Sequence, residues 1–249
     1  MPPALRCYWD AGPNPAMLAE DEVHVWAVDL EAPTSAVSNL ESLLSVAEQE
    51  KAGRFHFDHD RRRFIASRAC LRVLAGRYLG IPPEQPVFSN TDDGKPFLAG
   101  SGLEFNLSHS HQGGLLAFSL ARPVGVDLER MDARRDLLSL ARFSFSEQEQ
   151  NIFTSLPADQ QTEAFYNAWT RKEAYVKALG KGLALPLDSF DVSLRPGEAA
   201  RLLGTDDHHE KCGEWQMHSL NPFPGYRGAI IAAGDDWKPC CFALPDLRG

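Results

Sequence analysis

Two long helical patterns, each ending at a glycine, restrict the folds open to this chain more than any other feature. The first covers Asp58–Leu79 and the second covers Gln160–Leu179. Gly80 and Gly180 follow them, and a glycine just past the last turn is a common helix end. Short β-rich stretches follow each helix, with a seam near Pro123. We therefore expect an α+β protein with two halves of similar plan. No repeat is visible residue by residue, so a duplicated fold is a hypothesis at this point.

The smaller elements follow from periodicity and capping signals. Ser45 with Glu48, and Ser146 with Glu149, form S-x-x-E capping boxes, which predict the starts of two short helices. A further helix is expected at Ala133–Phe143. The expected strands are Val23–Leu30, Leu103–Ser108, Leu115–Leu120, Val124–Glu129, Leu187–Leu194, Glu214–Leu220 and Tyr226–Ala233, with a polar loop at Gly204–Gly213 that contains His208 and His209.

The composition limits the size of the core and the compartment. The chain has 249 residues, 43% of them hydrophobic and 24% charged, enough for one large domain or two of about 120 residues each. No apolar run approaches the ~18 residues of a membrane span, and the N-terminus lacks the apolar segment of a signal peptide. We therefore expect a cytoplasmic protein. No C-x-x-C pair occurs in the chain, which argues against a disulfide framework or a zinc site. The five cysteines are Cys7, Cys70, Cys212, Cys240 and Cys241.

The net charge of -9 argues against a general nucleic-acid binder, which is usually basic. A local basic cluster can still attract a small anion to a cleft. Arg61, Arg62 and Arg63 form such a cluster at the start of the first long helix. Three successive residues cannot share one helix face, so at most one or two of them can point into a cleft. A solvated helix face is an equally good interpretation of these arginines.

Two carboxylates end the apolar strand Val124–Glu129. Asp127 and Glu129 are two residues apart, which places both on the same face of a strand. Adjacent carboxylates repel each other unless a cation or a proton lies between them. On a surface edge the pair would be unremarkable. At the end of an apolar strand it indicates a divalent metal site.

The segment Trp169–Leu183, at the end of the second long helix, carries another acid and a lysine. Trp169, Glu173 and Lys177 are spaced by four residues and share one helix face. Taken alone, Glu173 and Lys177 are best interpreted as an exposed ion pair. They can also be half of a site, with the carboxylate on a metal and the lysine on a phosphate. Trp169 is interpreted as packing that holds the helix in place.

The polar residues that remain suit phosphoryl chemistry on a pyrophosphate. P-loop, Rossmann, H-E-x-x-H and G-x-S-x-G motifs do not occur. A transition-metal site at His109 and His111 is a weaker alternative, because no cysteine accompanies them. Carboxylates suit Mg²⁺, which bridges to substrate phosphates, and lysine or imidazolium neutralises the remaining charge. The set consists of Lys95, Ser108, His109, Asp127, Glu129, Glu173 and Lys177.

Three blocks resemble one enzyme family. FNLSHS (Phe105–Ser110), VGVDLE (Val124–Glu129) and WTRKEAYVKALGKGL (Trp169–Leu183) look like the surfactin-type 4′-phosphopantetheinyl transferases, in its W-x-x-K-E-A subgroup. DDGKPFL (Asp92–Leu98) and LPLDSF (Leu185–Phe190) extend the match. The resemblance implies transfer of phosphopantetheine from coenzyme A to a carrier-protein serine, with release of adenosine 3′,5′-bisphosphate. It also implies a monomer of two pseudo-twofold subdomains, residues 1–122 and 123–249, each a small, mainly antiparallel sheet packed with a long helix, with the active site at their interface.

The resemblance also implies roles for individual residues. The Mg²⁺ ligands, which could also hold Mn²⁺, are Asp127, Glu129 and Glu173, and Lys177 matches the lysine on the pyrophosphate. Glu173 or a water on the metal would accept the serine proton, and the sequence does not choose between them. The other expected contacts to coenzyme A are Ser108 and His109 near the 3′-phosphate and pyrophosphate, Lys95 near the adenosine, and Arg63 on the 3′-phosphate, with Lys51 a weaker candidate.

The carrier protein is the second expected partner. Carrier proteins are typically acidic, and this chain is acidic too, so docking should use a local basic and apolar surface. Met131–Arg142 (MDARRDLLSLAR) has both characters, although its leucines fit a core equally well. Two other functions use the same residues: a Mg²⁺-dependent nucleotide hydrolase and a non-catalytic module that binds coenzyme A or a carrier. The sequence does not select the carrier or its pathway.

Overall fold

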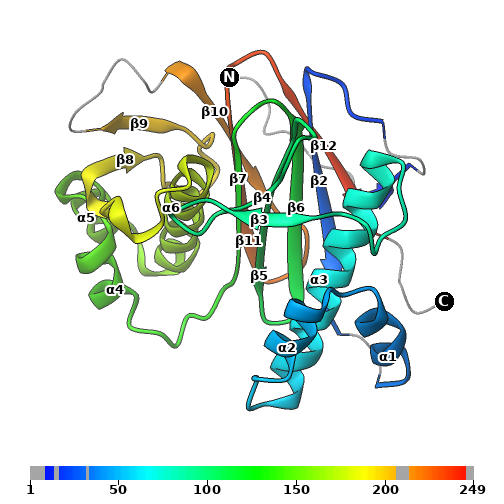
Figure 1. The fold of residues 1–249 in the computed structure, drawn as a ribbon. Coiled ribbons are helices and arrows are strands. Elements are labelled where there is room, and N and C mark those ends of the chain that lie inside the picture. The colour runs from blue at the N-terminus through cyan, green and yellow to red at the C-terminus, as the bar shows by residue number, and fades with distance from the viewer. Residues whose placement is uncertain (1–8, 14–16, 32–33, 206–212, 245–249) are drawn as a thin grey trace.

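The chain folds into two sheets that face each other, with helices on both outer sides (Figure 1). The computed structural model describes residues 9–13, 17–31, 34–205 and 213–244. Helices of the first half cover one sheet, and helices of the second half cover the other. This mixed arrangement of helices and small sheets confirms the expected α+β class.

The larger sheet has five strands in the order β1-β12-β2-β6-β5. β2, β6 and β5 pair antiparallel, whereas β12 is parallel to both of its neighbours, β1 and β2. Helix α3 packs on this sheet, and α1 and α2 flank it. The elements are β1 (Asp10–Ala11), β2 (Glu22–Asp29), α1 (Thr34–Ser42), α2 (Val46–Ala52), α3 (Asp58–Leu79), β5 (Leu103–Ser110), β6 (Gly113–Leu120) and β12 (Lys238–Ala243), with a small hairpin of β3 (Phe88–Asn90) and β4 (Pro96–Leu98).

The smaller sheet has three antiparallel strands in the order β10-β11-β7. Helix α6 lies across it, and α4 and α5 pack on the other side of α6 around an aromatic cluster of Phe145, Phe153 and Phe165. The elements are β7 (Val124–Arg130), α4 (Leu137–Ser144), α5 (Glu147–Ser155), α6 (Ala158–Leu179), η1 (Gly182–Ala184), η2 (Leu187–Ser189), β8 (Phe190–Val192), β9 (Leu202–Thr205), β10 (Trp215–Leu220) and β11 (Tyr226–Ala233).

An apolar layer joins the two sheets. Val25 and Leu115 from the larger sheet meet Val126 and Ile230 from the smaller one, and all four side chains are buried. Because side chains alternate along a strand, the opposite faces of the same strands pack against the helices. Both sheets are therefore buried on both faces near their centres, which explains why β6 is almost wholly apolar and why β7 begins with an apolar stretch.

Several expectations are confirmed. The two long helices exist and end at Gly80 and Gly180, both in the left-handed conformation that glycine adopts freely (φ 66° and 70°). Both capping boxes are formed, because Ser45 and Ser146 each exchange hydrogen bonds with the glutamate three residues later. The predicted loop residues His208 and His209 lie outside the described residues.

Two element predictions are wrong in detail. The helix expected at Ala133–Phe143 begins only at Leu137, because Asp136 caps it by accepting a hydrogen bond from the Ser139 amide. The strand expected at Leu187–Leu194 begins instead as the 3₁₀ turn η2. There the Ser189 hydroxyl and amide both donate to the Pro186 carbonyl, and such local bonds compete with strand pairing.

The last described strand crosses the expected boundary between the subdomains. β12 belongs by sequence to the range 123–249, but it pairs with β2 in the sheet of the first half. The division at residues 122 and 123 therefore does not separate the sheets cleanly.

None of the helices among the described residues has the length and apolar character that a membrane span needs.

Candidate active site

The candidate site forms where β5, β7 and α6 meet. A close approach of α6 to β7 brings the three elements together at Gly125. A Cβ atom at this position would lie 2.0 Å from the Ala174 carbonyl oxygen and 2.4 Å from the Ala178 amide nitrogen, so only glycine fits. This contact sets the α6 side chains Glu173 and Lys177 beside the carboxylate strand.

Side chains, rather than backbone groups, connect β5 to β7. Each strand pairs through its backbone with another neighbour, β5 with β6 and β7 with β11. Every second side chain of β5 then accepts a hydrogen bond from a β7 amide. The three contacts are Val126 N to Asn106 Oδ1 at 2.9 Å, Leu128 N to Ser108 Oγ at 3.3 Å, and Arg130 N to Ser110 Oγ at 3.2 Å. We call these three contacts the β5–β7 ladder.

The ladder serines also hold the two carboxylates of β7. Ser108 Oγ donates to Asp127 Oδ1 at 2.8 Å, and Ser110 Oγ donates to Glu129 Oε2 at 2.8 Å. The predicted placement of Asp127 and Glu129 on one face of the strand is confirmed by these parallel contacts. Each serine hydroxyl accepts from a β7 amide and donates to a β7 carboxylate, so it fixes both strand and acid.

Asp127 is the most buried of the three candidate metal acids, with 3% of its surface exposed. Its Oδ1 atom also accepts from Lys177 Nζ at 2.5 Å, and Lys177 Nζ lies 2.9 Å from Ser108 Oγ. Its Oδ2 atom is buried and has no hydrogen-bond partner among the described residues. A buried carboxylate oxygen without a partner is costly, and a cation at this oxygen would remove the cost.

The pKa values of Glu129 and Glu173 indicate that both belong to the same site as Asp127. Burial raises the pKa of Glu129, and the nearby charge of Asp127 raises it further. Burial likewise raises the pKa of Glu173, again with a contribution from Asp127. Both carboxyls are therefore ionised less readily than usual while no cation is bound. Mutual repulsion among three acids is the arrangement that a divalent ion relieves.

The ion pair expected between Glu173 and Lys177 is replaced by a different one. Lys177 pairs with Asp127 from β7 rather than with the glutamate one turn earlier on its own helix. Trp169 stacks on Phe165 with ring centroids 5.8 Å apart and lies against the core of the second half. The interpretation of Trp169 as packing is thus confirmed.

His109 lies close enough to Lys177 and Arg63 for both charges to act on it. His109 is reachable by solvent, and desolvation by its surroundings lowers its pKa, followed by the charges of Lys177 and Arg63. Arg63 therefore lies close enough to His109 for its charge to act there. Its guanidinium donates to Glu31 at 2.6 Å, whereas the neighbouring arginines pair elsewhere, Arg61 with Glu41 and Arg62 with Asp58.

Lys95 connects the small hairpin to the second half. Its Nζ donates to the Ala178 carbonyl at 2.9 Å and to the Val124 carbonyl at 3.3 Å. Burial lowers the pKa of Lys95. The amine is thus engaged by backbone carbonyls at the end of α6 and the start of β7, rather than held free in solvent.

Sequence reasoning did not single out two groups beside the site. Asn106 and Ser110 are ladder residues, and their signal is the alternation N-x-S-x-S along β5. Lys172, next to Glu173, is fully buried and forms a 2.7 Å ion pair with the equally buried Glu149. The sequence signal that could have pointed to this pair was the capping box, because Glu149 is the glutamate three residues after its Ser146.

The segment proposed for docking is split between core and surface. Leu137 is buried and Leu140 packs against the core, as the alternative interpretation expected. Leu138 is 43% exposed, and Phe143, just past the segment, is 87% exposed. Arg135 and Arg142 are exposed beside them. The outer side of α4 therefore combines apolar and basic groups.

Comparisons with known proteins identify relatives along most of the chain. Residues 123–233 match the model of the 4′-phosphopantetheinyl transferase superfamily, and residues 31–120 match that of the 4′-phosphopantetheinyl transferase N-terminal region. The chain is 39% identical to the 4′-phosphopantetheinyl transferase HetI of Nostoc sp., over 94% of this chain and 98% of that protein. It is 30% identical to the transferase Sfp of Bacillus subtilis, over 86% and 93%. Among solved structures, holo-acyl-carrier-protein synthase of Thermotoga maritima aligns with a TM-score of 0.34 and 19% identity, over 45% of this chain and 62% of that one.

Proposed function

The chain belongs to the 4′-phosphopantetheinyl transferase superfamily, and we propose that the site at β5, β7 and α6 is the centre of its reaction. In this reaction phosphopantetheine passes from coenzyme A to a serine hydroxyl of a carrier protein, and adenosine 3′,5′-bisphosphate is released. The observation that carries the assignment is the buried Asp127 carboxylate. One of its oxygens is held by Ser108 and Lys177, and the other has no partner among the described residues.

The donor set fits Mg²⁺, and Mn²⁺ would suit the same ligands. Asp127, Glu129 and Glu173 would hold the ion, because oxygen ligands are those that Mg²⁺ prefers. The unpartnered Asp127 Oδ2 and the raised pKa values of both glutamates support this assignment. When bound, the ion supplies positive charge that stabilises the pyrophosphate as its P–O bond breaks.

The protein's own side chains orient the substrate. Lys177 carries a fixed positive charge that would bind a pyrophosphate oxygen, and its contact with Asp127 aims it. Ser108 holds Asp127 and Lys177 together, so we propose it as a positioning residue as well as a contact to coenzyme A. His109, exposed beside them, would donate a hydrogen bond to the phosphates.

Glu173 is the proton acceptor that we propose for the carrier serine. A carboxylate inside a site can accept a proton as a general base, and Glu173 lies near enough to Asp127 for their charges to interact. The serine oxygen attacks the β-phosphorus, its proton passes to Glu173, and the P–O bond to the adenosine bisphosphate breaks. Glu173→Gln cannot accept the proton, whereas Glu173→Asp can, and the two variants therefore test this role.

The 3′-phosphate site is assigned to Arg63. Its charge acts at His109, and its one ion-pair partner among the described residues, Glu31, is half exposed, so a phosphate can replace Glu31 at small cost. Arg63→Gln should raise the KM for coenzyme A without changing the KM for 3′-dephospho-coenzyme A. Lys95 keeps its proposed place near the adenosine, as the residue that ties the β3–β4 hairpin to α6.

For the carrier, we propose docking at Met131–Arg142 together with Phe143. Leu138 and Phe143 offer exposed apolar area, and Arg135 and Arg142 offer charge complementary to an acidic partner. Phe143→Ser should raise the KM for the carrier and leave the KM for coenzyme A unchanged. Leu140→Ser is the contrasting variant, because Leu140 packs in the core and its loss should reduce stability.

We also propose the pseudo-twofold division into residues 1–122 and 123–249, with β12 crossing into the sheet of the first half and the site between the two halves. Two 22-residue helices ending at left-handed glycines and two capping-box helices support it. The enzyme would act as a monomer in the cytoplasm, without nucleic acid or membrane. Sedimentation with and without coenzyme A tests the monomer, and cell fractionation tests the compartment.

The decisive experiment is a carrier assay. Purified protein, coenzyme A and Mg²⁺ should add the mass of phosphopantetheine to an apo-carrier, and Asp127→Asn should abolish the gain. Fatty-acid, polyketide and peptide carriers are compared side by side, since the chain does not identify its carrier. No gain with any of them would refute the transferase assignment, and phosphate release from coenzyme A without a carrier would favour a hydrolase.

A further inference from the structure

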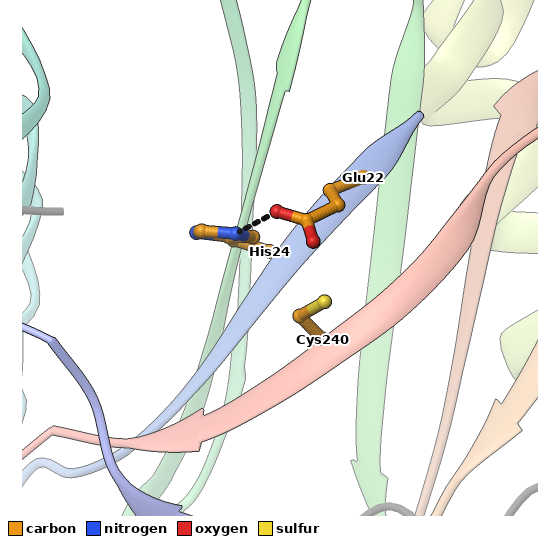
Figure 2. A group of neighbouring side chains, drawn as sticks. All are labelled: Glu22, His24 and Cys240. Carbon is orange, nitrogen blue, oxygen red and sulfur yellow. Dashed lines mark hydrogen bonds and ion pairs between the residues drawn. The ribbon is translucent and has the colours of Figure 1, made fainter. Parts of the chain in front are cut away.

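A second group of potential metal ligands lies in the other half of the molecule, on β2 and β12. It consists of Glu22, His24 and Cys240, whose ligand atoms all lie within 4.8 Å of one another. Figure 2 shows the three side chains pointing toward one another, with His24 and Glu22 on one strand and Cys240 on the next. We call this group the β2–β12 triad.

The parallel pairing of the two strands creates the triad. Cys240 is the register partner of His24, and Lys238 is the register partner of Glu22. In a parallel pair, such partners point to the same face of the sheet. The triad faces α3, because Tyr78 of that helix contacts His24. The Mg²⁺ acids lie elsewhere, at β7 and α6, so the two groups do not share a ligand.

The imidazole of His24 is held in a fixed position. Its Nδ1 atom lies 2.8 Å from the Tyr78 hydroxyl, and the same hydroxyl accepts from Trp26 Nε1 at 2.7 Å. Phe242 packs edge-on to the ring with centroids 5.0 Å apart. Nε2 is thus left facing Glu22 at 3.1 Å. A histidine anchored through one nitrogen and presenting the other is the usual arrangement of a metal ligand.

The ligand types select the metal. A thiolate, an imidazole and one carboxylate suit Zn²⁺, whereas Mg²⁺ and Ca²⁺ require a set of oxygens. We propose that the β2–β12 triad binds Zn²⁺ and thereby fastens the last described strand to the larger sheet. Water would complete the tetrahedral shell, and the Cys240 thiol proton would pass to solvent on binding.

Lys238 is the group that opposes binding. Its Nζ lies 3.4 Å from Glu22 Oε1, but its side chain is 60% exposed and can turn into solvent. A purely structural hydrogen-bond cluster would lose an interaction when Lys238 is removed. A zinc site would instead gain affinity, because Glu22 is released. The sign of the Lys238→Met effect on zinc binding therefore separates the two interpretations.

The test is zinc binding by the whole protein in excess Mg²⁺, followed by calorimetry and by thermal unfolding. We expect one Zn²⁺ per chain and a higher Tm with zinc. In the Co²⁺ form, we expect the absorption of a thiolate ligand. Cys240→Ser and Glu22→Gln should each weaken binding at least about tenfold, and Tyr78→Phe about tenfold. Lys238→Met should strengthen it about two- to fivefold.

Matched controls separate the triad from other thiols and acids. Cys70→Ala removes a thiol outside the triad, Glu20→Gln removes an exposed acid two residues from Glu22, and Asp127→Asn alters the proposed Mg²⁺ site. All three should bind zinc like the unmodified protein. The proposal is overturned if the unmodified protein binds no zinc, or if Cys240→Ser and Glu22→Gln bind it with unchanged affinity. It is also overturned if Lys238→Met weakens binding.

Discussion

Helices α3 and α6 are built alike but serve different purposes. Each has 22 residues and ends at a left-handed glycine. Each carries a buried cation fourteen residues after its first residue, Arg72 in α3 and Lys172 in α6. In both halves this cation contacts the third-position glutamate of a capping box, Glu48 or Glu149.

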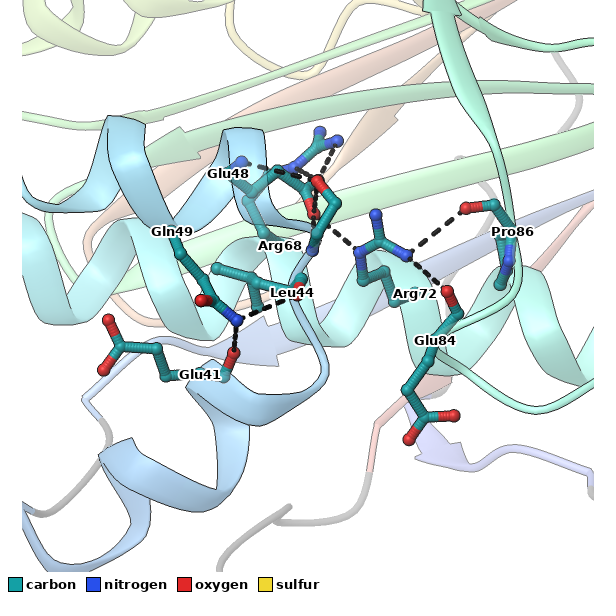
Figure 3. Close-up of polar contacts among 9 residues, drawn as sticks. Glu41, Leu44, Glu48, Gln49, Arg68, Arg72, Glu84 and Pro86 are labelled. Carbon is teal, nitrogen blue, oxygen red and sulfur yellow. Dashed lines mark hydrogen bonds and ion pairs between the residues drawn. The ribbon is translucent and has the colours of Figure 1, made fainter.

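The two contacts differ in their surroundings. Glu48 pairs with two arginines, Arg68 and Arg72, and its side chain is 11% exposed. Figure 3 shows Arg72 reaching from Glu48 to the carbonyls of Glu84 and Pro86. Glu149, by contrast, has one cationic partner among the described residues, Lys172, and both side chains are fully buried.

The residues that follow the cations differ more. One position after Arg72 stands Val73, whereas one position after Lys172 stands Glu173. Five positions after them stand Arg77 and Lys177. At these matched positions, therefore, only α6 carries a proposed metal ligand. We infer that the buried cation fixes each helix, and that the next residue decides whether the helix supplies a metal ligand.

The largest effect should come from breaking the fully buried pair. Lys172→Met leaves Glu149 without its cation and should cost about 3–5 kcal/mol of unfolding free energy. Arg72→Met should cost less, about 1.5–3 kcal/mol, because Arg68 still serves Glu48. Urea unfolding measures both. Equal losses would remove the distinction between the halves, and recovery in the double variant Lys172→Met with Glu149→Gln would strengthen it.

The next effect concerns activity. Glu173→Gln should lower kcat about a hundredfold, which corresponds to about 2.7 kcal/mol, because the proposed metal ligand and proton acceptor is lost. Val73→Ala, at the matching position of α3, should leave kcat unchanged and cost about 1 kcal/mol of stability. Carrier modification under saturating substrates measures the first, and urea unfolding the second. A comparable fall in kcat for Val73→Ala would contradict the inferred difference between the two helices.

The helix ends should respond more weakly. Alanine in the left-handed conformation costs about 1–2 kcal/mol, so Gly80→Ala and Gly180→Ala should both destabilise the protein. A Cβ at Gly80 meets nothing within 4 Å, whereas one at Gly180 lies 3.1 Å from Lys95 Cδ. Gly180→Ala should therefore be the more harmful of the two, as measured by thermal unfolding. The order should disappear in a Lys95→Ala background.

The smallest effect is expected from pH. Burial would raise the pKa of Glu48, but Arg68 and the other partners outweigh it and lower that pKa below 4.5. Burial raises the pKa of Glu149 above the same value. A carboxyl whose pKa is lower in the folded protein than in the unfolded chain stabilises the fold at pH values above its unfolded pKa. This stabilisation is lost as the pH falls through the folded pKa. A carboxyl whose pKa is higher in the folded protein stabilises the fold at pH values below its unfolded pKa. That stabilisation is lost as the pH rises through the folded pKa.

Glutamine variants make this contrast measurable. The stability difference between unmodified protein and Glu48→Gln should increase with pH, and the difference for Glu149→Gln should decrease with pH. Urea unfolding between about pH 3 and about pH 8 covers both transitions. Parallel curves for the two variants would show that the two glutamates have equivalent surroundings after all.

Local signals predicted the helices and their ends well. The periodicity, the capping boxes and the glycines involve residues within a few positions of one another, and the structure bears them out. The shared face of Asp127 and Glu129 follows from strand geometry alone. The partner of Lys177 did not follow, because Asp127 is fifty positions away and a helix pattern offers only the closer Glu173.

Non-local pairing accounts for what the sequence did not predict. β12 reads KPCCFA, with a proline and no alternation of apolar and polar residues, and its partner β2 lies at the other end of the chain. The same distance hides the β2–β12 triad. Spacing rules find cysteine ligands that are close in sequence, so they could not detect Cys240 beside His24.

The position of β12 also bears on the order in which the molecule can be assembled. This strand lies between β1 and β2 and is the neighbour through which β1 joins the sheet. During synthesis, residues 10 and 11 leave the ribosome early, but their docking site is completed only when residues 238–243 emerge. Pairing over such a long stretch of chain is slow. Until then β2 presents an unpaired edge, so the nascent chain should depend on chaperones late in its synthesis rather than early.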